Sequence, residues 1–109
     1  MDEIQQAARR LIRTNLQRFV CEKMNVRHPD DVWTNLLWLA EGFERDARED
    51  WQALVERHGK PPLTQIVPQA LSKAVENATL PYENTVSPEV LKGLVQLYLD
   101  GFNGGEVFR

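Results

Sequence analysis

Apolar residues recur every three or four positions in four separate stretches of this chain. This spacing places each set along one side of an α-helix. The stretches predict helices over about residues 3–23, 30–58, 65–78 and 88–100. No stretch alternates apolar and polar residues, so we expect no sheet. The pattern therefore predicts an all-α fold, a bundle of four main helices in one domain spanning residues 1–109.

Capping residues mark the ends of the predicted helices. Asp30 or Asp31 can accept hydrogen bonds from the first turn of the second helix. Gly59 suits the position just after that helix, because glycine tolerates a left-handed backbone. Ser87 followed by Pro88 gives a capping residue and then a favoured first helical residue. The short loops predict that successive helices are antiparallel neighbours.

Three positions leave the details of these helices open. Gly42 lies inside the second helix, so that helix is either continuous or broken near this residue. Pro68 must lie in the first turn of its helix, because a proline deeper inside removes a hydrogen bond. Residues 103–109 form a short flexible tail unless Phe108 docks on the bundle.

Charge, cysteine content and the lack of long apolar runs bear on the compartment in which this protein resides. The 109 residues include 13 basic and 16 acidic residues and a single cysteine. Residues 1–28 hold six basic against three acidic side chains, and residues 29–58 hold three against eight. No apolar run reaches the ~20 residues that span a bilayer, and the N-terminus lacks a signal-peptide core. We therefore predict a cytoplasmic protein with no membrane association.

Trp38 is the residue most informative about function. On the second helix it lies roughly opposite the apolar stripe that runs through Trp33, Phe43 and Trp51, on the side that holds Thr34, Arg45, Glu49 and Gln52. Exposed tryptophans are enriched at interface hot spots, which favours a partner-binding patch of Trp38, Arg45, Glu49 and Gln52. The apolar run over residues 36–40 favours the alternative, that both sides of this helix are buried. A homodimer contact through this side satisfies both interpretations.

The basic residues of the first helix allow two interpretations. Arg9, Arg10, Arg13 and Arg18 can contact nucleic-acid phosphates or another acidic partner. They can equally pair with the acidic residues of the second helix, within one chain or between two. The second interpretation needs no partner and follows from the opposite charges of the two segments.

Glu41 and Glu44 match Glu-x-x-Glu, which is one half of the motif of helical nucleotide pyrophosphohydrolases. The chain has no Glu-x-x-His motif and no matching Glu-x-x-Asp on a later helix, and its histidines and cysteine are not spaced as metal ligands. We therefore expect a solvated acidic side, with no metal and no cofactor. A lone cysteine is usually a packing residue.

From these observations we predict that the protein is a protein–protein interaction module without enzymatic activity. It would be a small bacterial- or phage-type adaptor, inhibitor or accessory subunit that presents a helical surface to a protein partner, with a homodimer as one form. The alternative is a nucleic-acid-binding regulator that uses the basic first helix. A small metal-dependent nucleotide hydrolase is the least supported hypothesis.

Overall fold

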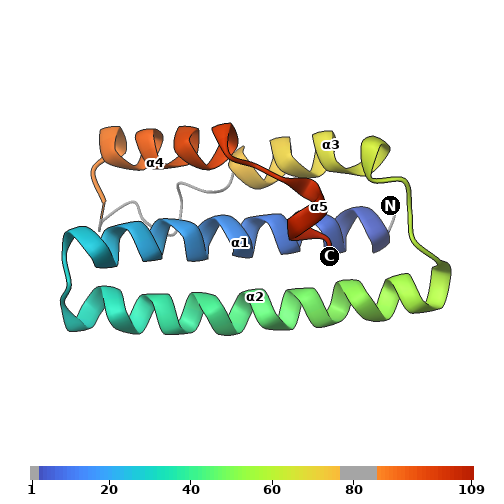
Figure 1. Cartoon of the computed structure of the whole chain (residues 1–109), viewed down its shortest axis with the longest axis horizontal. Coiled ribbons are helices and arrows are strands. Elements are labelled where there is room, and N and C mark those ends of the chain that lie inside the picture. The colour runs from blue at the N-terminus through green and yellow to red at the C-terminus, as the bar shows by residue number, and fades with distance from the viewer. Residues whose placement is uncertain (1–2, 77–85) are drawn as a thin grey trace.

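The regular structure in the described part of this chain is helical throughout, as the computed structural model in Figure 1 shows. The structure describes residues 3–76 and 86–109. Its helices are α1 (Glu3–Arg27), α2 (Asp31–His58), α3 (Leu63–Glu76), α4 (Pro88–Asp100) and α5 (Gly104–Val107). No strand occurs in the described ranges, so the predicted all-α bundle of four main helices is confirmed.

Helix α1 lies at the centre of the bundle. In Figure 1, α2 runs along one side of α1, while α3 and α4 lie end to end on the other side. The more extensive helix–helix contacts of the described residues all involve α1. Its side chains Leu11, Ile12, Leu16 and Val20 are completely buried, because neighbours cover more than one side of this helix. The expectation that successive helices are neighbours holds for α1 and α2 but is wrong for α2 and α3.

Side-chain caps fix the beginnings of α2 and α4. The Asp30 carboxylate accepts a hydrogen bond of 3.0 Å from the backbone N–H of Trp33. The Ser87 hydroxyl accepts one of 3.3 Å from the backbone N–H of Val90. Gly59 follows α2 with a φ of 84°, a value that glycine adopts readily. Both predicted N-terminal signals are thus confirmed, and α2 continues without a break through Gly42.

Two predicted helix ends differ from the structure. Helix α1 continues to Arg27, about one turn beyond the predicted end. Helix α3 begins at Leu63, so Pro68 is its sixth residue and lies in the second turn; the prediction of a first-turn position is wrong. The missing N–H of Pro68 leaves the carbonyl of Thr64 without its usual helical donor. The predicted end of this helix at residue 78 lies outside the described residues.

The C-terminal segment docks on the bundle. Phe108 is 3% exposed and packs on Trp51 of α2, with the ring centroids 4.8 Å apart. The Arg48 guanidinium donates a 2.7 Å hydrogen bond to the backbone carbonyl of Val107. The prediction of a flexible tail is therefore wrong, because an aromatic anchor and a backbone hydrogen bond hold the segment against α2.

Two further features of the described residues bear on the class of protein. Cys21 is a buried thiol, 2% exposed and packed in the core as predicted. None of the helices in residues 3–76 and 86–109 combines the length and apolar character needed to span a bilayer.

Candidate functional site

Among the residues that the structure describes, neighbours cover a single side of helix α2. Its buried residues are Trp33, Ala40, Glu44, Ala47 and Trp51, which follow one another at helical spacing and face α1 and α5. One neighbouring helix covers a narrower stripe than two neighbours would. The remaining sides of α2 are consequently open to solvent along most of its 28 residues.

Four large apolar side chains of α2 are exposed. Trp38 is 72% exposed, Val32 60%, Phe43 52% and Leu39 45%. At 100° per residue, the arc from Trp38 through Leu39 to Phe43 spans about 140°. The prediction that Phe43 belongs to the core stripe is wrong, and so is the interpretation that Trp38 is buried. Together with Asn35 and Gly42, which lie inside this arc, these four residues are called the outer face of α2 below.

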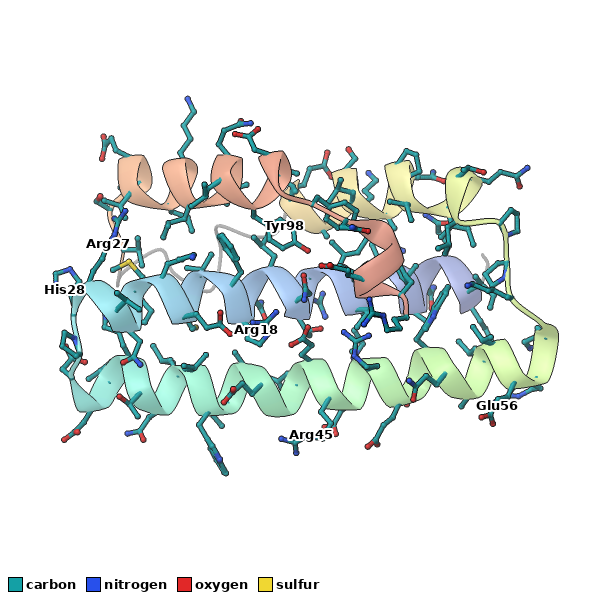
Figure 2. The ribbon with its side chains drawn as sticks, in the orientation of Figure 1. Arg18, Arg27, His28, Arg45, Glu56 and Tyr98 are labelled. Atoms are coloured by element: carbon teal, nitrogen blue, oxygen red, sulfur yellow. The ribbon has the colours of Figure 1, made fainter. Side chains whose placement is uncertain are left out.

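The other predicted partner-binding residues are also exposed. Arg45 and Glu49 are seven and eleven positions after Trp38, which places them on the same side of α2. In Figure 2, Arg45 points away from the bundle. Gln52 lies roughly 20 Å along the helix axis from Trp38, at the rim of a hollow lined also by Trp51 and Phe108. All four residues are thus exposed on α2, but Glu49 and Gln52 lie roughly 16 Å and 20 Å along the axis from Trp38.

A buried polar cluster joins three helices on the side of α2 that faces α1. Glu44 is 8% exposed and accepts hydrogen bonds from Asn15 Nδ2 at 2.6 Å and from Arg18 Nε at 2.5 Å. Arg48 approaches the same carboxylate at 3.6 Å. The prediction that this acidic stretch is solvated is wrong for Glu44, because α1 supplies donors that satisfy a buried carboxylate.

Tyr98 extends this polar cluster to α4. Its hydroxyl donates a 2.6 Å hydrogen bond to Asn15 Oδ1, so the hydrogen bonds run from α4 through α1 to Glu44 of α2. Figure 2 shows Arg18 between α1 and α2, and Tyr98 between α4 and α1. Burial raises the pKa of the Tyr98 hydroxyl well above its ordinary value, and the negative charge of Glu44 raises it further. The tyrosine therefore acts as a neutral hydrogen-bond donor.

The cluster borders an open pocket of about 470 Å³, whose walls include Arg18, Glu44, Tyr98 and Phe102. Arg18 also pairs with Glu22. Burial by itself would lower the pKa of Arg18, but the carboxylates of Glu44 and Glu22 outweigh it and raise the pKa. The Glu44 carboxylate holds donors from α1 and so joins α1 to α2.

The structure separates the two glutamates of the candidate metal motif. Glu41 is exposed, whereas Glu44 is buried in the polar cluster. Within residues 3–76 and 86–109, no group of three or more histidine, cysteine, aspartate or glutamate side chains is arranged to hold a metal ion.

Two of the four arginines named above on α1 are paired with carboxylates of the same chain. Arg10 pairs with Asp50 of α2, and Arg18 is held by Glu44 and Glu22. Arg13 is exposed and Arg9 is half-buried. The predicted pairing of α1 arginines with α2 carboxylates is confirmed for Arg10, and Arg18 forms such a pair as well.

Sequence reasoning missed the residues of the polar cluster, although each left a signal. Glu44 follows Ala40 by four positions and precedes Ala47 by three, so it falls on the core stripe of α2. Asn15 lies next to Leu16 and four positions after Leu11 on α1. A polar residue at a core position of each of two adjacent helices indicates a buried hydrogen bond between them.

Comparisons of the chain with protein-family models, with curated proteins and with solved structures found no match.

Proposed function

We propose that this chain is a protein–protein interaction module that binds a partner through the outer face of α2. It would serve as a small bacterial- or phage-type adaptor, inhibitor or accessory subunit, in a reducing compartment such as the cytoplasm. One observation carries the proposal: α2 has apolar side chains on two sides, and the described parts of the chain cover only one of them.

Trp38 is the anchor of this proposed site. An aromatic side chain buries ~150–250 Å² when it is fully covered, and apolar burial contributes about 25 cal/mol per Å². Trp38 is 72% exposed, so covering it would stabilise a complex by roughly 3–4 kcal/mol before the cost of association. Side chains of this type dominate measured binding energies.

Nucleic-acid binding has less support from the geometry. Arg10 and Arg18 are engaged with carboxylates of the same chain, and phosphates would have to displace those partners. Retention on DNA or RNA that falls steeply with added salt would favour this alternative, because counterion release drives such binding.

The test compares wild-type protein with Trp38→Ala in capture experiments from the native host, quantified by mass spectrometry. Leu97→Ala is the matched control, because Leu97 is 52% exposed but lies on α4, in the opposite layer. We expect Trp38→Ala to lose proteins that both wild type and Leu97→Ala retain, with circular dichroism unchanged. Identical sets of bound proteins for all three would refute the proposal.

A further inference from the structure

The outer face of α2 combines an uncharged centre with opposite charges at its two ends. Asp31, Trp38 and Arg45 follow one another at seven-residue spacing, and all three are exposed. They therefore form a row along one edge of the outer face, with the tryptophan midway between an acid and a base. Glu41 lies about 60° from Trp38, on the side away from Leu39 and Phe43, and therefore outside the arc of the outer face.

The second edge of the outer face carries a matching apolar row. Val32, Leu36, Leu39 and Phe43 follow at steps of four, three and four, the spacing of a helix–helix seam; Leu36, at the border of the outer face, is only partly exposed because it also packs against the core. The steps read the same in both directions, and the midpoint of the row lies between residues 37 and 38. The charged row has its midpoint at Trp38, so both rows share nearly the same centre.

Gly42 lies between the two rows, at a position where the fold leaves room for a side chain. A Cβ atom at this position would meet nothing within 4 Å, and the residue is helical. Alanine would favour the helix more strongly than glycine does. A residue without a side chain on an exposed apolar face instead allows a second helix to approach closely.

We infer that the partner of this face is a second copy of the chain, with the two α2 helices packed antiparallel around a two-fold axis at Trp38. This inference rests on the proposed function. Antiparallel pairing places Trp38 against Trp38 of the second copy, and each Arg45 opposite an Asp31. Val32 then faces Phe43, and Leu36 faces Leu39. Parallel pairing around a two-fold axis would instead place the charged row of each copy against the apolar row of the other.

The area of this face is sufficient for a dimer. Its four exposed apolar side chains offer on the order of 400 Å² per copy, since each fully buried aromatic covers ~150–250 Å². With the polar rim that makes up roughly 40% of an interface, the contact approaches the ~800 Å² per partner of a standard interface. We therefore expect association at micromolar concentrations or below.

The test measures self-association by analytical ultracentrifugation between about 1 and 200 μM. Trp38 fluorescence provides a second readout, because Trp33 and Trp51 are already buried and only Trp38 would lose water on pairing. We expect a concentration-dependent blue shift in wild type. Trp38→Ala should weaken the dimer by at least about 30-fold. Gly42→Gln should weaken it while leaving the melting temperature unchanged or higher.

Charge exchange tests the antiparallel arrangement directly. Asp31→Arg and Arg45→Asp should each weaken self-association about tenfold, because each places like charges opposite one another. The double variant carrying both changes should regain wild-type association, and so should an equimolar mixture of the two single variants. Urea unfolding of each variant at low concentration shows that the fold itself is intact.

Each outcome separates this inference from the proposed function. A wild-type chain that stays monomeric throughout the range overturns the second-copy inference, as does a double variant no stronger than the single variants. If Trp38→Ala still loses a captured host protein under those outcomes, the proposed function stands without self-pairing. If Trp38→Ala changes neither self-association nor capture, both fall.

Discussion

Replacing Glu44 with alanine should destabilise the fold more than any other single change to a charged residue of α2. Glu44 is the shared acceptor of Asn15 and Arg18 and lies close to Arg48. Its removal leaves two donors of α1 pointing into a partly buried space with no acceptor. The outer face of α2 is not involved, so this change tests the bundle separately from the interaction surface.

The size of this destabilisation follows from how deeply the side chains of Glu44, Asn15 and Arg18 are buried. Removing one partner of a fully buried ion pair costs about 3–5 kcal/mol, and an unsatisfied buried amide costs about 1–3 kcal/mol. The Arg18 side chain is 27% exposed and keeps Glu22, so part of the first cost is relieved by water. We expect a loss of about 2–4 kcal/mol in the free energy of unfolding, against a total of roughly 5–15 kcal/mol for a domain of this size.

Urea unfolding followed by circular dichroism gives this free energy, and a thermal scan should show a melting temperature lower by roughly 10–20 °C. Glu44→Gln should lie between wild type and Glu44→Ala, because the amide keeps one acceptor oxygen. Glu49→Ala is the control on the same helix; Glu49 is exposed, and we expect a change within about 0.5 kcal/mol. The reasoning fails if Glu44→Ala and Glu49→Ala unfold at the same urea concentration.

Three further variants probe other parts of the structure. Tyr98→Phe should lower the free energy of unfolding by about 1 kcal/mol at neutral pH, because it removes the hydrogen bond that the tyrosine hydroxyl donates. Burial raises the pKa of Tyr98 in the folded protein. Its contribution to the free energy of unfolding is therefore complete below the pKa of an unfolded tyrosine, near 10, and declines above it by up to ~1.4 kcal/mol per pH unit. The free energy of unfolding, measured from pH 8 to 11, should consequently vary less with pH in Tyr98→Phe than in wild type. Phe108→Ala should cost about 3–5 kcal/mol in urea unfolding, since its ring packs on buried Trp51; a change below 1 kcal/mol would mean that the segment does not dock. Gly42→Ala should raise the unfolding free energy of the monomer by about 0.5–1 kcal/mol, because the added Cβ meets nothing; a loss of stability would show that the glycine is needed inside its own fold.

The sequence by itself determined the helices and most of their ends. Apolar spacing is a local property, so it locates α1, α2, α3 and α4 without knowledge of their neighbours. The capping residues act within a single turn, and Asp30 and Ser87 cap the helices that were expected of them. The opposite charges of the first two helices likewise anticipated the pairing of Arg10 with Asp50.

Only the tertiary structure decided which side of α2 is covered. Its N-terminal half has apolar residues on two sides, and the spacing alone cannot show whether a second neighbour packs there. Because α3 packs on α1 instead, Trp38 and Phe43 remain exposed. Glu44 is buried for a related reason: its donors come from residues 26 and 29 positions away. Contacts at that distance depend on how the helices pack, and packing is what local periodicity leaves open.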